Sequence, residues 1–105
     1  IFLMTRTISI LMPVKHIDDS FRQSIQSVAG CSPKPHEVIV IFDGKPDQAI
    51  PETGIENIRF IQLEKSRGPA AARNEGARQA TGEILLFVDA DVIVPKDLVA
   101  KISHA

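Results

Sequence analysis

The sequence predicts an α/β fold, a three-layer sandwich in which helices cover both faces of a mainly parallel sheet. Three short apolar runs, at 8–12, 38–42 and 84–88, do not alternate with polar residues, which is typical of strands buried on both faces. Segments with helical periodicity lie between these runs. Because strands and helices alternate along the chain, we expect βαβ units and a parallel sheet between two helical layers.

The strands follow from the apolar runs in order. The first is predicted over ISILM (8–12) and the second over VIVIF (38–42). A weaker run at 58–63 alternates apolar and polar residues, which indicates a half-buried strand nearer an edge of the sheet. The fourth is predicted over ILLFV (84–88). The stretch 43–57 is rich in Pro, Gly, Asp and Glu, so we expect a long, exposed and mobile loop there.

Three helices are predicted in the remaining segments. The first covers 18–28, where apolar residues recur at spacings of four and three, and Gly30 ends it. Three polar residues are candidates for its amino-terminal cap: Asp18, Asp19 and Ser20. The second covers the alanine-rich stretch 69–80, begins with a proline and is closed by Gly82. The third covers 95–104.

Length and composition exclude several classes of protein. The 105 residues are 44% apolar and 24% charged, which is typical of one globular domain over 1–105. The net charge of −1 gives no basic surface for nucleic acid. The single cysteine, Cys31, excludes an internal disulfide and a multi-cysteine metal site, and it favours a reducing compartment. No stretch reaches the ~20 apolar residues of a membrane span and no signal-peptide pattern is present, so we expect the protein in the cytoplasm or at the cytoplasmic face of the membrane.

Residues with binding chemistry follow the predicted strands. Pro13 and Val14 end the first strand, Asp43 ends the second, and Asp89 and Asp91 follow the fourth. The carboxyl ends of parallel strands share one edge, where open α/β sheets bind ligands, so we expect these residues close together. Two carboxylates at this spacing suit magnesium or manganese, which share their coordination shell with substrate phosphates. The alternative is that the aspartates cap a helix, solvate a loop or form an Asp-Gly turn.

A second group of candidates lies where the helix over 69–80 begins. Gly68 permits a tight backbone path into this helix, whose amino end favours negative charge. Arg67 and Arg73 are candidate contacts for a phosphate or a base. The alternative is that these are solvated arginines on a helix packed closely on the sheet, an interpretation that fits Arg78 best and Arg73 least.

Several common sites are not indicated. Ser9 and Ser66 lack the G-x-S-x-G context of a catalytic nucleophile, and Cys31 has no adjacent base. Neither the phosphate-loop motif nor the dinucleotide fingerprint is present. Three histidines lack metal-ligand spacing and are expected at the surface: His16, His36 and His104.

Three segments resemble, in order and spacing, the amino-terminal half of family 2 glycosyltransferases of the GT-A fold: ISILMPVK, HEVIVIFDG and LEKSRGPAAARNEGARQATGEILLFVDADVIVPKDLV. The family pattern is a strand ending in Pro-Val, a strand ending in Asp-Asp-Gly, a Gly-x-x-x-Ala-Arg-Asn helix and a strand ending in Asp-x-Asp. The resemblance covers 7 to about 103 and is most specific over 65–91. It implies a Rossmann-like, nucleotide-binding GT-A half.

The resemblance also implies a site for a nucleotide-diphospho-sugar donor, a UDP- or GDP-sugar. The implied nucleotide-binding residues are Pro13, Val14, Asp43, Arg73 and Asp89. The first two line the nucleoside pocket, the first aspartate contacts the base, and the arginine lies near the nucleotide. Asp89 meets the ribose or a metal, and Asp91 holds a divalent cation, manganese or magnesium, on the diphosphate. The implied reaction is metal-dependent transfer of the sugar to an acceptor hydroxyl, with inversion.

The chain departs from the family pattern in three places. Lys15-His16 stands for Tyr-Asn, Phe42 for the first aspartate of the pair, and Lys45-Pro46-Asp47 for Ser-Thr-Asp. No general base for the acceptor is identified. We therefore expect an amino-terminal donor-binding portion, inactive alone, whose acceptor half follows residue 105. Apolar surface that this half would cover favours self-association of the portion alone.

Other functions are weighed against this one. A non-catalytic or degenerate nucleotide- or metal-binding α/β module is the main alternative, and Phe42 favours it. A receiver-type phosphoacceptor domain is disfavoured because the first strand ends in Met-Pro-Val rather than in acids. A nucleotidylyltransferase would need a glycine-rich, basic loop after that strand, which this sequence lacks.

Overall fold

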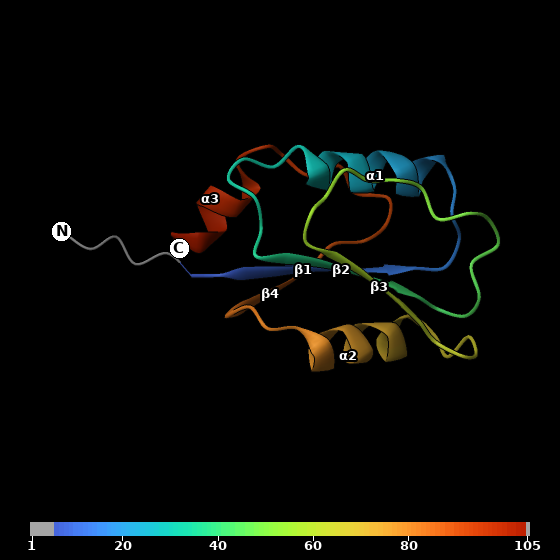
Figure 1. Ribbon diagram of the computed structural model, residues 1–105. Helices are drawn as coiled ribbons and strands as arrows, with labels where there is room; N and C mark the ends of the chain where they lie inside the picture. Colours follow the sequence, from blue (N-terminus) through green and yellow to red (C-terminus); the bar gives the residue numbers. More distant parts are fainter. Residues whose placement is uncertain (1–5, 105) are drawn as a thin grey trace.

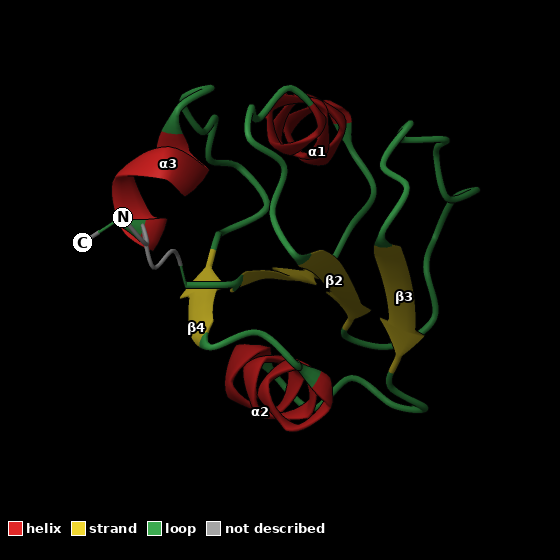
Figure 2. Cartoon of the chain, turned by 60° about the vertical axis from the view of Figure 1, so that its left-hand side comes forward, coloured by secondary structure: helices red, strands yellow, loops and turns green. Residues whose placement is uncertain are grey.

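The computed structural model describes residues 6–104, and its strands and helices alternate as predicted. Four parallel strands form one sheet in the order β3-β2-β1-β4. The elements are β1 (Ile8–Val14), α1 (Asp19–Ala29), β2 (Glu37–Phe42), β3 (Ile58–Gln62), α2 (Pro69–Gln79), β4 (Ile84–Phe87) and α3 (Leu98–Ser103). Helices α1 and α3 lie on one face of the sheet and α2 lies on the other (Figures 1 and 2). The α/β three-layer sandwich is confirmed.

The two central strands supply most of the core because both of their faces are covered. Successive side chains of a strand point to opposite faces. Ile10 and Met12 of β1 belong to the cluster that contains the apolar face of α1, whereas Leu11 belongs to the cluster on the α2 side. Every residue of β2 is buried. The predicted burial on both faces is therefore confirmed for β1 and β2.

The same prediction is wrong for β4. The side chains of Leu85 and Phe87 are 38% and 43% exposed. β4 is an edge strand that pairs only with β1 among the described strands, and α2 packs beneath β1 and β2. Leu85 and Phe87 pair in register with Ser9 and Leu11 of β1, so they share the sheet face that carries α2 but lie beyond the cover that this helix gives. Strand β3 lies at the other edge, as its alternating pattern predicts.

The predicted starts of α1 and α2 are confirmed, whereas α2 ends before Gly82 and α3 starts later than predicted. Asp18 caps α1 through a hydrogen bond from the Phe21 N–H at 2.9 Å, and Gly30 ends the helix. Helix α2 begins at Pro69 but ends at Gln79, before Gly82. Gly82 instead passes so close to β1 that an added Cβ would lie 2.5 Å from the Ser9 hydroxyl oxygen.

Helix α3 is shorter than the predicted 95–104 because its first carbonyl groups have other partners. The Lys96 carbonyl accepts a hydrogen bond from the Ser32 N–H at 2.9 Å. The Pro95 carbonyl lies 3.8 Å from the Cys31 thiol and accepts from the Leu98 N–H at 3.1 Å. This stretch therefore continues as an irregular connection until Leu98.

A buried carboxylate ties the sheet to the connection between α2 and β4. Glu37 accepts hydrogen bonds from the Ser9 hydroxyl at 2.6 Å, the Thr81 N–H at 2.6 Å and Arg59 at 3.2 Å. The Ser9 oxygen in turn accepts from the Gly82 N–H at 2.8 Å. Burial alone would raise the pKa of Glu37, but these hydrogen bonds outweigh it and lower the pKa from 4.5 to about 2.

The segment 43–57 contains neither helix nor strand and is largely exposed from residue 45 onward, as expected for a long loop. It is tethered near its start, because the Asp47 carboxylate accepts a hydrogen bond from the Ile17 N–H at 3.2 Å. Among residues 6–104, no helix has the length and apolar character needed to cross a membrane. The start of the chain, 1–5, part of the region for which no signal peptide is expected, lies outside the described residues.

Candidate functional site

The ends of β1 and β2, the start of α2 and the residue after Val88 surround one cavity of about 380 Å³, here called the donor cavity. Its lining is Pro13, Val14, Lys15, Asp43, Ser66, Gly68, Pro69, Ala72, Arg73 and Asp89. All five residues that the sequence assigns to a nucleotide lie in this lining. The prediction that parallel strand ends meet at one edge is confirmed for Pro13, Val14, Asp43 and Asp89, whereas Asp91 lines an adjoining hollow. The contacts of these residues with a nucleotide stay predictions.

The donor cavity has an apolar part and a charged part. Val14 and Ala72 are 2% and 0% exposed, so these apolar walls are set by the core rather than by mobile side chains. Pro13 lies in β1 beside Ile41 of β2, in the regular parallel register. The charged groups come from Lys15, Asp43, Arg73 and Asp89. A few charged groups on rigid apolar walls are the usual composition of a small-molecule site.

Asp43 fixes the entry into α2. Its carboxylate accepts hydrogen bonds from the Arg67 N–H at 2.7 Å, the Gly68 N–H at 3.1 Å and the Ser66 hydroxyl at 3.0 Å. The Arg67 N–H is the largest cause that holds the pKa of this carboxyl below its ordinary value, and the Ser66 hydroxyl and Gly68 N–H act in the same direction. The structure therefore gives Asp43 a definite role in positioning α2, and any base contact would add to these hydrogen bonds.

The beginning of α2 lines the donor cavity with Gly68, Pro69, Ala72 and Arg73. Gly68 adopts φ 93°, a left-handed conformation that favours glycine, and Pro69 follows it. The N-cap residue Gly68 offers no side chain to the helix, whose first turn carries no acidic residue, and the carboxylate nearest this end is that of Asp43, which accepts the Gly68 N–H. The helix dipole favours negative charge at this end of an 11-residue helix.

Arg73 and Asp89 form an ion pair in the lining of the donor cavity. The Arg73 Nη2 lies 3.7 Å from the Asp89 Oδ1, with the two side chains 43% and 68% exposed. An ion pair this exposed contributes little to stability. Both groups are thus accessible to a ligand at low energetic cost.

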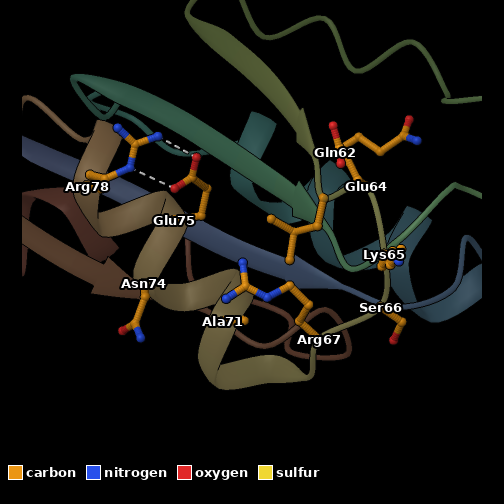
Figure 3. Close-up of a pocket in the computed structure, with 10 residues that line it drawn as sticks. Gln62, Glu64, Lys65, Ser66, Arg67, Ala71, Asn74, Glu75 and Arg78 are labelled. Carbon is orange, nitrogen blue, oxygen red and sulfur yellow. Dashed lines mark hydrogen bonds and ion pairs between the residues drawn. The ribbon is translucent and has the colours of Figure 1, made fainter.

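Arg67, Asn74 and Arg78 lie away from the donor cavity. They line an open groove of about 1000 Å³ between α2 and the segment after β3, shown in Figure 3. Glu75 accepts two hydrogen bonds from Arg78 there, at 2.8 and 2.5 Å. This groove is larger than the donor cavity, its Glu75 and Arg78 are paired with each other, and Ser66 alone is shared between the two linings. The solvated-arginine interpretation is confirmed for Arg78, whose side chain is 69% exposed, and Arg67 contributes its backbone rather than its guanidinium to the site.

The two aspartates after β4 line different hollows. Asp89 lines the donor cavity, whereas Asp91 lines an adjoining hollow of about 270 Å³ with His16 and Asp18. Pro13 and Lys15 belong to both linings. In the part of the chain that the structure describes, no three acidic, histidine or cysteine side chains are grouped closely enough to hold a metal ion. The two carboxylates nevertheless fit the oxygen chemistry of magnesium or manganese, which is often bound by one or two carboxylates together with phosphates.

Sequence reasoning missed Lys15 and Ser66 as parts of the site. The Lys15 ammonium hydrogen-bonds to the Ser66 hydroxyl and lies 3.8 Å from the Asp43 carboxylate. Lys15 stands out in the sequence only as a departure from the family pattern. Its place directly after the end of the first strand was the signal that could have found it.

The cysteine and the histidines show no sign of a catalytic role. Cys31 is 4% exposed, and burial raises the pKa of its thiol, which keeps it in the unreactive protonated form. His16 lies 3.5 Å from the Asp47 carboxylate and His36 hydrogen-bonds to Thr81. Both histidines lie in exposed settings.

Known proteins resemble this chain over nearly all of its length. The model of the family described as Glycosyl transferase family 2 matches residues 9–104. An uncharacterized glycosyltransferase of Haemophilus influenzae is 34% identical over 99 residues, which are 90% of this chain and 40% of the relative. The poly-beta-1,6-N-acetyl-D-glucosamine synthase of Staphylococcus epidermidis is 32% identical over 95 residues, 86% of this chain and 23% of the synthase.

Solved structures agree with these relatives. S. aureus TarS 1-349 in complex with UDP superposes with a TM-score of 0.75 at 28% identity, over 91% of this chain and 30% of that one. The mannosyltransferase PcManGT of Pyrobaculum calidifontis, in complex with GDP-Man and Mn2+, gives a TM-score of 0.77 at 21% identity, over 95% and 32%, and shows the fold alone. The chain thus spans less than half of each protein that it matches here. With its parallel sheet, its donor cavity and a family match over residues 9–104, the chain belongs to glycosyl transferase family 2.

Proposed function

We propose that this chain forms the donor-binding part of an enzyme that transfers a sugar from a nucleotide-diphospho-sugar to an acceptor hydroxyl. The observation that carries the proposal is the donor cavity itself. It brings the five residues that the family resemblance assigns to a nucleotide together at the start of α2. The UDP bound in the TarS complex, whose chain is 28% identical to this one, supports a UDP-sugar, and a GDP-sugar is the other donor class to be tested.

The lining indicates how a nucleotide diphosphate would lie. The apolar walls at Pro13 and Val14 suit the nucleoside, beside Asp43 as an acceptor for a base N–H. The positive end of the α2 dipole and the Arg73 guanidinium suit the phosphates. Asp89, which pairs with Arg73 at 3.7 Å, is proposed to meet the ribose hydroxyls or the metal.

A divalent cation, manganese or magnesium, belongs to this proposal, with Asp91 and Asp89 as its protein ligands. Such an ion neutralises charge on the diphosphate as it departs. The two carboxylates line adjoining hollows that share Pro13 and Lys15, so a bound diphosphate would complete a shell that the protein does not close alone.

The proposed transfer proceeds with inversion. The acceptor oxygen attacks the anomeric carbon from the face opposite the diphosphate, and the carbon–oxygen bond to the phosphate breaks with its electron pair leaving on the diphosphate. A general base takes the proton from the acceptor hydroxyl. No residue of 6–104 is assigned that role, so the proposal places the base and the acceptor site in a further part of the protein and treats this chain alone as inactive.

The proposal also includes the cell compartment of the protein and the self-association of the chain. We place the protein in the cytoplasm or at the cytoplasmic face of a membrane, in line with one buried, free cysteine. We expect the chain produced alone to self-associate, because Leu85 and Phe87 expose apolar surface beside an unpaired strand edge. Sedimentation over a range of concentrations tests this, and a monomer at all concentrations would contradict it.

Calorimetric titration of UDP and GDP into the 105-residue chain, with manganese and again with EDTA, tests the proposed function. Binding of one nucleotide that weakens in EDTA is the expected result, and the preferred base identifies the donor class. Absence of binding by both nucleotides with manganese would contradict a working donor cavity in this chain.

A degenerate module is the second candidate, favoured by Phe42. This residue stands where the family pattern has an aspartate, is 1% exposed, and stacks on Phe60 with ring centroids 6.1 Å apart. A position that carries an aspartate in the family pattern is therefore part of the apolar core in this chain. Nucleotide binding without sugar transfer by the full-length protein would favour this candidate.

A further inference from the structure

Two serine hydroxyls of α1 hold the segment that carries Asp89 and Asp91. The Ser24 hydroxyl donates to the Val92 carbonyl at 2.6 Å and lies 3.4 Å from the Asp89 carbonyl. One turn further along the helix, the Ser27 oxygen accepts from the Val94 N–H at 3.0 Å. The contacts therefore fix the backbone both before and after Asp91.

The backbone needs these contacts because the sheet no longer supplies partners there. The last ladder bond of this region is donated by the Val88 N–H to the Leu11 carbonyl at 2.9 Å, and β4 ends at Phe87. After that point a turn forms, closed by the Val92 N–H on the Asp89 carbonyl at 3.1 Å. Backbone groups beyond the ladder need other partners, and the Val92 carbonyl and the Val94 N–H have the two serine hydroxyls as theirs.

Ser24 is suited to this task by its burial. It is 0% exposed, although it is a polar residue on a helix that otherwise turns apolar side chains to the sheet. Its hydroxyl cannot exchange its partners for water, so the distance between α1 and the turn is set by this hydrogen bond. Helix α1 itself contributes no side chain to the donor cavity.

We infer that Ser24, assisted by Ser27, is a positioning residue that sets where Asp89 and Asp91 stand at the edge of the donor cavity. The inference rests on the proposed function for its consequence, which is that nucleotide binding in the presence of manganese depends on Ser24. The geometric part, that the two hydroxyls order the turn, stands on the hydrogen bonds alone.

The test uses the 105-residue chain with Ser24→Ala, and Ile25→Val as the matched control. Ile25 is the next residue of α1, is 2% exposed, and packs in the core without a hydrogen bond to the turn. Amide hydrogen exchange of 89–94 should accelerate in Ser24→Ala and stay unchanged in the control. The affinity for UDP with manganese should fall about tenfold, equivalent to about 1.4 kcal/mol. The affinity in EDTA should fall less, because only the contact of Asp89 with the nucleotide is then affected.

The two readouts separate a positioning role from a loss of stability. A general structural effect would change the affinity equally with manganese and with EDTA, and that result would overturn the inference. Unchanged exchange in 89–94 would overturn it as well. If the unsubstituted chain binds neither UDP nor GDP, the proposed function fails, whereas the exchange experiment still decides whether the serines order the turn.

Ser27→Ala provides a second variant should Ser24→Ala not fold. It removes the acceptor of the Val94 N–H and the hydrogen bond from the Ser27 hydroxyl to the Ser24 carbonyl within α1, and it keeps the hydrogen bond between Ser24 and Val92. Faster exchange at Val94, with a smaller loss of manganese-dependent affinity than in Ser24→Ala, is the expected result. Unchanged exchange at Val94 would contradict the role of Ser27.

Discussion

Replacing Glu37 by glutamine should remove an acid-dependent part of the stability of this fold. The carboxylate is buried, with its side chain 7% exposed, and one of its oxygens accepts hydrogen bonds from both the Ser9 hydroxyl and the Thr81 N–H. A glutamine amide keeps one acceptor oxygen and places an N–H₂ group among donors. The variant therefore loses hydrogen bonds as well as the charge.

The size of the effect follows from the pKa of Glu37, which falls from 4.5 to about 2 on folding. This difference corresponds to about 3 kcal/mol of stability. Because the folded-state value is the lower one, the contribution is fully present above pH 4.5 and is lost as the pH falls towards 2.

Urea unfolding followed by far-UV circular dichroism between pH 7 and pH 2.5 measures this pH-dependent part of the unfolding free energy. The difference in unfolding free energy between the unsubstituted chain and Glu37→Gln should narrow by about 2.5 kcal/mol over that range. A difference that stays constant with pH would refute the reasoning. Glu56→Gln is the matched control, since the Glu56 side chain is 86% exposed and pairs with Lys34 at 3.9 Å. It should change the unfolding free energy by less than about 0.5 kcal/mol.

The other predictions concern the donor cavity and the backbone. Arg73→Ala should weaken UDP binding by about 1–3 kcal/mol in calorimetry, the cost of a lost charged hydrogen bond, while Arg78→Ala on the same helix leaves it unchanged; equal affinities would place Arg73 outside the nucleotide site. Asp91→Asn should abolish the manganese-dependent part of nucleotide binding without lowering the thermal midpoint, and an unchanged affinity would remove the metal assignment. Gly82→Ala should lower the unfolding free energy by about 1–3 kcal/mol, because the new Cβ would lie 2.7 Å from the Ser9 backbone nitrogen and 2.5 Å from its hydroxyl; a stability within error of the unsubstituted chain would show that β1 can yield there.

Most of the sheet could be predicted because β1 and β2 are apolar on both faces, a pattern typical of a strand with helices on both sides of its sheet. The run at 84–88 has the same pattern, yet β4 is half exposed. The hydrophobic pattern indicates which side chains favour burial. It does not indicate whether a helix packs over them in the folded structure. One helix, α2, packs on its face of the sheet, and it lies beneath β1 and β2.

In the site, too, the features that follow from the strand pattern were predictable, whereas contacts between residues distant in sequence were not. The strand ends that carry Asp43 and Asp89 follow from topology, so their meeting at one edge was predictable. The tether from Asp43 to the backbone of Arg67 and Gly68 links groups about 24 residues apart, and no local pattern reports it. The role of Ser24 is harder still, because a serine within an amphipathic helix differs little in sequence from a solvated one.

The position of β1 has a consequence for how the chain folds. β1 lies inside the sheet, yet its partner on one side is β4, with Ile8 paired to Ile84. The backbone groups along that edge of β1 therefore find their ladder partners in a segment 76 residues later. Contacts this distant in sequence slow folding and lengthen the time for which apolar strands meet other molecules. In refolding followed by pulsed hydrogen exchange, the amides of α1 and α2 should gain protection before those of the ladder between β1 and β4.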